Sequence, residues 1–205
     1  MSACGVRWRL AAWRWRVAVW LGQHPQALAE LDRWLAVAPP SDIQGRRQAI
    51  WHAWATRAHV LAAMHRWPEA VDQLQALTHA QPLHAAHHFN LGFAMQRTGQ
   101  WAQAEQAFRQ ALELSPRLDV AWFGLGDVLQ RQGQHAEAEQ AWARQTELQP
   151  FCSDGLERLV QMHVALGQWH QATQRLDQIK AFAPRTAMAL EPLMSGAPLQ
   201  ERARA

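Results

Sequence analysis

Small and apolar residues recur with helical spacing over residues 85–118, in two runs separated by a glycine. The first run occupies i, i+3, i+4 and i+7, one face of a helix, at His88, Leu91, Gly92 and Met95. Gly99 ends this helix, because glycine readily adopts the left-handed conformation found at helix C-termini. The second run is Ala104, Phe108 and Ala111, and Pro116 ends its helix. The pattern predicts two consecutive helices joined by a tight turn.

A six-residue string marks this turn and occurs five times along the chain. Its copies are 22–27, 65–70, 99–104, 133–138 and 167–172. The last four copies begin 34 residues apart, and the first interval is 43 residues, which is one period plus nine residues. A proline follows the final alanine of every copy by 12 residues, at Pro39, Pro82, Pro116, Pro150 and Pro184. A fixed period of this length indicates a helical-repeat protein.

These positions resemble the tetratricopeptide repeat family, whose pattern is a large residue, Leu-Gly, an aromatic, then Ala, Phe, Ala and a closing Pro. Residues 119–152 match this pattern at Trp122, Leu125, Gly126, Leu129, Ala138, Trp142 and Pro150. The resemblance covers residues 8–41, 51–84, 85–118, 119–152 and 153–186. It implies an all-α fold, a right-handed superhelical solenoid of about five helix–turn–helix repeats over residues 8–186. Residues 1–7 would form a lead-in and residues 187–205 a C-terminal tail.

The first unit departs from the family pattern. Arg14 and Trp15 stand where the family has Leu and Gly. A better apolar stripe on this helix consists of Leu10, Trp13, Val17 and Leu21. We therefore expect the first helix to be rotated or shifted by one residue.

Two further segments lie outside the regular period. Residues 42–50 are an insertion, and Ser41 with Gln44 forms a capping box after two prolines. We expect the insertion to extend a helix, giving one long helix from about residue 42 to residue 64. The tail is interrupted by Pro192, Gly196 and Pro198. We expect it to be either a frayed end or a strap across the last repeat, rather than a polar-faced capping helix.

Composition and charge narrow the classes of function. Hydrophobic residues make up 49% of the chain and charged residues 18%, which is enough apolar material for a core. The net charge of +3 is too mild to indicate nucleic-acid binding by itself. Cys4 and Cys152 match no metal or redox spacing. Arginines interrupt the apolar N-terminal stretch, so we expect neither a signal peptide nor a membrane span, and a cytoplasmic protein.

Catalytic and metal chemistry have little support in the sequence. We find no recognisable nucleophile motif and no glycine-rich phosphate loop, so we expect no enzyme activity and no cofactor. His84, His87 and His88 are close in sequence, and His52 and His59 share a helix face. Zinc needs three or four converging ligands, and His88 falls at a core position facing the partner helix. We therefore expect no metal site.

The resemblance implies that the first helix of each repeat lines a concave groove. Counting along the repeats gives the candidate partner-binding residues Arg16, Trp20, His59, Phe89, Asn90, Phe93, Gln96, Arg97, Phe123, Asp127, Gln130 and Arg131. The three phenylalanines lie beside core positions, so they either anchor an apolar partner segment or pack between repeats. Arg97 and Arg131 are equivalent residues one repeat apart. They either select carboxylate groups or are solvated.

Some tetratricopeptide domains hold a partner's C-terminal carboxylate with Lys, Asn and Arg side chains from consecutive repeats. Here Asn90 matches one of these positions, but the flanking repeats offer Ala55, His59, Val120 and Gly124. The resemblance therefore argues against that mode of binding. Our leading prediction is a scaffold or adaptor that binds a protein or peptide segment in the groove.

The N-terminal helix offers an alternative, because it combines tryptophans with arginines. The residues are Arg7, Trp8, Arg9, Trp13, Arg14, Trp15, Arg16 and Trp20. Such a helix can contact nucleic acid, a membrane surface, another protein or a second copy of the chain. We expect a protein contact or homo-oligomerisation rather than nucleic-acid or membrane binding.

Overall fold

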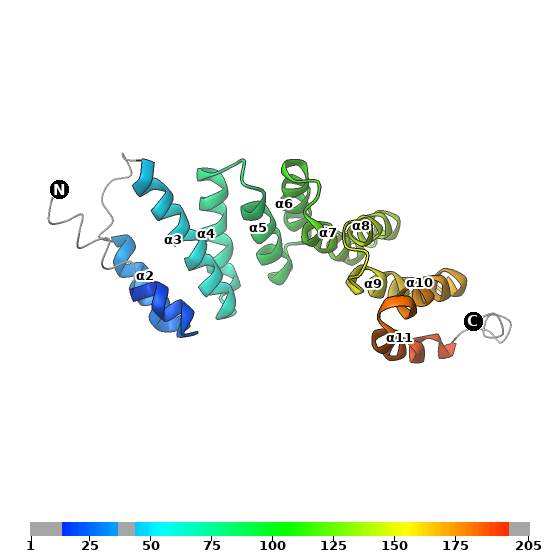
Figure 1. The fold of residues 1–205 in the computed structure, drawn as a ribbon. Coiled ribbons are helices and arrows are strands. Elements are labelled where there is room, and N and C mark those ends of the chain that lie inside the picture. The colour runs from blue at the N-terminus through cyan, green and yellow to red at the C-terminus, as the bar shows by residue number, and fades with distance from the viewer. Residues whose placement is uncertain (1–13, 37–43, 197–205) are drawn as a thin grey trace. The chain divides into compact units, whose positions relative to one another are not determined.

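The computed structural model describes residues 14–36 and 44–196, and every regular element in these two ranges is helical. The chain divides into an N-terminal unit, residues 1–114, and a C-terminal unit, residues 115–205. Each unit is built of sequential antiparallel helix pairs (Figure 1).

In the N-terminal unit, residues 14–20 are helical and precede α2 (His24–Ala36). The next two pairs are α3 (Gln44–Ala63) with α4 (Trp67–Ala80), and α5 (Ala85–Arg97) with α6 (Trp101–Leu114). The C-terminal unit contains α7 (Asp119–Arg131) with α8 (His135–Leu148), and α9 (Asp154–Ala165) with α10 (Trp169–Phe182). It continues with α11 (Pro184–Leu190) and the 3₁₀ helix η1 (Glu191–Gly196).

The repeated string forms the turn inside each pair. Its first residue has a positive φ in all five copies, at Gly22, His65, Gly99, Gly133 and Gly167. This conformation lets the backbone close the end of the preceding helix; for example, the amide of Gln134 donates to the carbonyl of Leu129 at 2.9 Å. Four of the five positions are glycine because only glycine takes this conformation without strain.

In the core of each pair, one residue of the first helix corresponds in repeat position to Gly92, and one residue of the second helix corresponds to Phe108. The pairs are Trp15 with Leu31, Ala58 with Leu74, Gly92 with Phe108, Gly126 with Trp142, and Val160 with Leu176. A β-carbon on Gly92 would lie 2.9 Å from the Phe108 ring, and one on Gly126 would lie 2.5 Å from Nε1 of Trp142. The absence of a side chain at these two glycines is therefore what admits the largest partners.

The expected shift of the first helix is wrong. Trp15 and Ala18 are buried, whereas Val17 and Leu21 of the expected stripe are exposed. Trp15 packs edge-on against Trp34 of α2, with ring centroids 6.3 Å apart. The helix keeps the family register because a large residue at the usual glycine position is balanced by a small one, Ala18, on the next turn. Leu10 and Trp13 of that stripe lie outside the described residues.

The insertion extends a helix, as the capping pattern predicts. The long helix α3 runs from Gln44 to Ala63. Residues 42 and 43, and the capping residue Ser41, lie outside the described ranges. The extension makes α3, with 20 residues, longer than the first helices α5, α7 and α9 of the later pairs.

The described part of the tail packs on the last repeat as the helices α11 and η1, a helical form that the sequence did not predict. Ala187 and Leu190 of α11 are buried, and α11 packs on α10. Gly196 of η1 lies close to the indole of Trp169 at the start of α10. The expected boundary after residue 186 therefore falls inside α11, and residues 197–205 lie outside the described ranges.

Candidate partner-binding site

A pocket of about 440 Å³ opens between α3, α4 and α5 in the N-terminal unit. Its lining residues are Ala55, Ala58, His59, Ala62, Ala63, Trp67, Leu74, Phe89, Asn90, Phe93 and Ala94. The α3 side is almost entirely alanine, so no side chain fills the space between the helices. A volume of this size lies in the range of pockets that bind ligands or partner side chains.

Three aromatic rings form one wall of the pocket. The rings of Trp67 and Phe93 meet edge to face with centroids 5.8 Å apart, and Phe93 stacks on Phe89 at 6.5 Å. Phe89 also lies 6.0 Å from Phe108 and is half-buried, while Phe93 remains 44% exposed. Phe89 is thus held by the core of its own pair, and Phe93 presents its ring to the opening.

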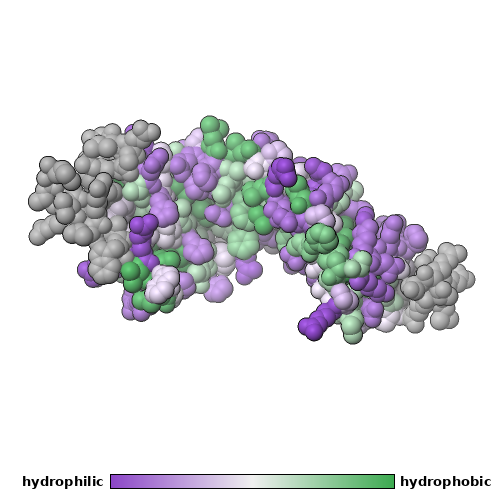
Figure 2. Space-filling model, viewed as in Figure 1, coloured by the Kyte–Doolittle hydropathy of each residue, from purple (hydrophilic) through white to green (hydrophobic). Residues whose placement is uncertain are grey.

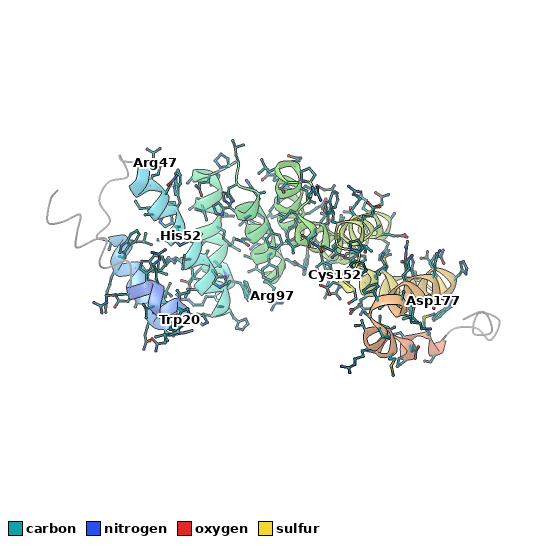
Figure 3. The ribbon with its side chains drawn as sticks, in the orientation of Figure 1. Trp20, Arg47, His52, Arg97, Cys152 and Asp177 are labelled. Carbon is teal, nitrogen blue, oxygen red and sulfur yellow. The ribbon has the colours of Figure 1, made fainter. Side chains whose placement is uncertain are left out.

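Polar groups stand at the edge of this apolar surface. Asn90 and His59 line the pocket and are exposed, and each can both donate and accept hydrogen bonds. The guanidinium carbon of Arg97 lies 5.2 Å from the centre of the Trp67 ring. Figure 3 shows Arg97 at the C-terminal end of α5. The arrangement combines an apolar cavity with a cation beside it.

The remaining candidates of this unit lie apart from the pocket. Gln96 is half-buried on α5 and does not line it. Trp20 is 83% exposed at the end of the first helix, and Arg16 lies 5.9 Å from the Trp15 ring on the same helix. The structure therefore groups His59, Phe89, Asn90, Phe93 and Arg97, and separates Arg16, Trp20 and Gln96 from them.

In the C-terminal unit a single arginine contacts two of the candidates. Arg158 of α9 places its Nε 3.1 Å from Oδ1 of Asp127, and its guanidinium carbon lies 5.6 Å from the centre of the Phe123 ring. Gln130 is half-buried and Arg131 is exposed, and neither lines the pocket of the N-terminal unit. Phe123 and Asp127 thus take part in a contact between α7 and α9.

Sequence reasoning missed two residues at these surfaces. Trp67 forms a wall of the pocket, but in the sequence it reads as a turn residue; the signal was its equivalence to Trp101 and Trp169, which also begin second helices. Arg158 occupies the repeat position of Asn90, two repeats further on. Both residues could have been found by aligning the five units column by column.

The histidines at the start of α5 are structural. His87 and His88 are buried; His87 donates through Nε2 to Oε1 of Gln81 at 2.7 Å, and His88 through Nε2 to the carbonyl of Pro82 at 2.8 Å. The His84 ring stacks on that of His87 with centroids 3.9 Å apart. Among the described residues no group of three His, Cys, Asp or Glu side chains could hold a metal ion.

Two family models match the chain, both described as tetratricopeptide repeat, over residues 55–116 and 96–156. This chain is a tetratricopeptide repeat protein. Such repeats generally mediate protein–protein interactions, and no enzyme family is detected. No curated protein matches the sequence of this tetratricopeptide repeat protein.

Solved structures resemble the tetratricopeptide fold of this chain. MamA from Desulfovibrio magneticus RS-1, residue 41 to its end, has a TM-score of 0.73 at 15% identity, with 96% of this chain and 99% of that chain covered. YrrB, described as a TPR protein with an unusual peptide-binding site, has a TM-score of 0.69 at 20% identity over 87% and 88% of the two chains. The first TPR of Spaghetti (RPAP3), bound to an HSP90 peptide, gives 0.55 at 21% identity over 57% and 92%.

At these identities the likeness shows the fold alone. In the described ranges of the tetratricopeptide protein no helix is both long and apolar enough to cross a membrane.

Proposed function

We propose that this protein is a scaffold that binds a segment of a partner protein in the pocket between α3, α4 and α5. The observation that carries the proposal is an apolar cavity walled by Trp67, Phe89 and Phe93, which a partner side chain could fill. Burying apolar surface in a preformed cavity is the main source of affinity at protein interfaces. Asn90 and His59 supply hydrogen bonds that would fix the partner's backbone.

Two relatives of the same fold support this proposal. The descriptions of YrrB and of the first TPR of Spaghetti refer to a peptide-binding site and to a bound peptide, respectively. In the present chain the cavity uses residues of two consecutive repeats, so a partner segment would cross the boundary between them. The aromatic wall would then hold the partner's apolar side chain, and the polar residues at the edge would orient the partner's backbone.

Phe93→Ala is expected to weaken partner binding about tenfold or more, because an aromatic wall of a buried anchor typically contributes above 1.4 kcal/mol. Stability should change little, since Phe93 is already partly exposed. Partners captured by the intact chain would be identified by mass spectrometry and titrated by calorimetry against both proteins. Leu83→Ala, another exposed apolar residue but outside the pocket, is the matched control. Equal affinities of the wild-type and Phe93→Ala proteins would rule out this pocket.

We propose self-association through the first helix as a second function. Val17 is 39% exposed, whereas its equivalents Val60, Ala94, Val128 and Met162 are 0–2% exposed. Val60 belongs to a core cluster with Leu28 and Leu31 of the preceding repeat. At Val17 the first helix therefore exposes the kind of apolar surface that packs against a preceding repeat elsewhere in the chain. Trp20 and Leu21, which are also exposed, extend this surface. Figure 2 shows apolar surface where Figure 1 draws this dark-blue helix.

The arginines of this helix favour a protein contact over nucleic acid. Arg14 forms an ion pair with Glu30 at 3.1 Å, and Arg16 lies beside the Trp15 ring. Side chains engaged within the protein are less available to phosphates. A nucleic-acid surface would show binding that falls steeply with salt concentration.

Self-association predicts a mass that rises with concentration in multi-angle light scattering. Replacing Trp20 with glutamate is expected to return the protein to the monomer mass, because a charge on this surface opposes apolar contact. Met188→Glu places the same charge on another exposed apolar residue and should leave the mass unchanged. A wild-type protein that stays monomeric at all concentrations would refute the second function.

A further inference from the structure

The cation beside the pocket, Arg97, differs from most of the described arginines of the N-terminal unit. Five of those arginines form ion pairs with carboxylates of the same unit, namely Arg14, Arg33, Arg57, Arg66 and Arg109. Arg97 is exposed, and within residues 14–36 and 44–196 its guanidinium has no ion-pair partner. The Arg97 guanidinium lies instead over the ring of Trp67.

The position of Arg97 is set by the wall of the pocket itself. Trp67 contacts Phe93, and the Arg97 guanidinium lies 5.2 Å from the centre of the Trp67 ring. A guanidinium that lies over an aromatic ring is attracted through its face, which leaves the N–H groups in its plane able to bind a carboxylate. Among the residues that the structure describes, no acidic side chain lines the pocket. An occupant of the pocket that carries a negative charge would therefore complement Arg97.

Resting on the proposed function, we propose that the pocket recognises a two-part motif, a large apolar side chain next to an Asp or Glu. The apolar side chain fills the cavity against Phe93, and the carboxylate binds the guanidinium of Arg97. Phe93 and Arg97 are one turn apart on α5, where the β-carbons of residues i and i+4 lie about 5–6 Å apart. An extended chain advances about 3.3–3.6 Å per residue, so the acid lies within two residues of the anchor. The partner is thus an acidic, apolar peptide segment.

The test is selection from a displayed library of random twelve-residue peptides on three immobilised proteins. These are the wild-type chain, Arg97→Gln and Arg131→Gln, the last being the equivalent arginine one repeat further on. Wild-type protein should enrich peptides with an aromatic or leucine residue and an Asp or Glu within two positions. The Arg97→Gln protein should keep the apolar preference and lose the acidic one. Selection on Arg131→Gln should resemble the wild type.

An enriched peptide then gives a quantitative check by fluorescence anisotropy. Changing its acid to the amide should weaken binding to wild-type protein about threefold to fivefold, as for an exposed ion pair, and leave binding to Arg97→Gln unchanged. The loss should shrink at high salt because exposed charges are screened.

The possible results distinguish a failure of the two-part motif from a failure of the pocket as a binding site. Apolar peptides without an acidic preference would overturn the motif while leaving the pocket as a binding site. An acidic preference lost in Arg131→Gln but kept in Arg97→Gln would overturn it as well. Failure to enrich any peptide whose binding depends on Phe93 would overturn both the motif and the proposed function.

Discussion

Trp142→Ala is expected to lower the free energy of unfolding by about 3–5 kcal/mol, the usual cost of removing a large buried aromatic side chain. Trp142 is fully buried in the pair α7–α8, where its indole packs against Gly126. Alanine would leave a cavity that two helices joined by a short turn cannot close. Urea denaturation followed by circular dichroism at 222 nm measures the change. Met188→Ala, at an exposed apolar residue, should alter stability by less than about 0.5 kcal/mol.

The reciprocal change at Gly126 tests the same contact from the other helix. Alanine is a better helix former than glycine by about 1 kcal/mol, so an open site would be stabilised by Gly126→Ala. Here the new β-carbon would lie 2.5 Å from Nε1 of Trp142, and we expect a net loss of about 1–3 kcal/mol. In a Trp142→Leu background the loss should disappear or become a gain. A stabilised Gly126→Ala protein with tryptophan in place would contradict the proposed packing.

Acid is expected to destabilise the N-terminal unit through His87, by about 1–3 kcal/mol at pH 4. Burial, and then the neighbouring His84 and His88 charges, lower the pKa of His87 from 6.5 to about 4. The Nδ1 atom of His87 is buried and has no hydrogen-bond partner among the described residues, so a proton added there would lack an acceptor. Burial thus favours the neutral ring in the folded protein.

The sign follows from proton binding. Between pH 6.5 and about 4 the unfolded chain protonates this histidine while the folded chain does not, so stability falls as the pH falls through this window. Below about pH 4 both states are protonated and the contribution levels off. Urea midpoints across pH 4–7 measure it, and His87→Gln should flatten the curve. The exposed His135→Gln is the control, and an unchanged slope in His87→Gln would exclude His87 as the cause.

Much of the fold follows from the sequence because the determinants of each helical pair are local. A residue with positive φ ends each first helix, proline follows each second helix, and small residues sit where two helices approach. The extension of α3 is equally local, because it depends on a helix start and on a continued apolar spacing. The form of the tail was left open by the sequence, since whether Leu190 is buried depends on the neighbouring α10.

The candidate site was predicted in part. Counting along the repeats placed His59, Phe89, Asn90, Phe93 and Arg97 together as groove residues. It did not include Trp67, because the first residue of a second helix reads as part of the turn. Nor did it find Arg158, whose contact with Asp127 joins helices of two repeats and depends on how those helices pack.

The sequence by itself determined the repeat length, the helix ends and the pairing of small with large residues, since these are set by neighbours within one turn or one hairpin. Tertiary structure decided which face of the first helix is buried. That helix has apolar residues on two sides, and only contact with α2 and α3 selects Trp15 and Ala18 over Val17 and Leu21. Packing also decided that alanines on α3 leave a cavity and that Arg97 lies against Trp67, because both depend on side chains from different helices.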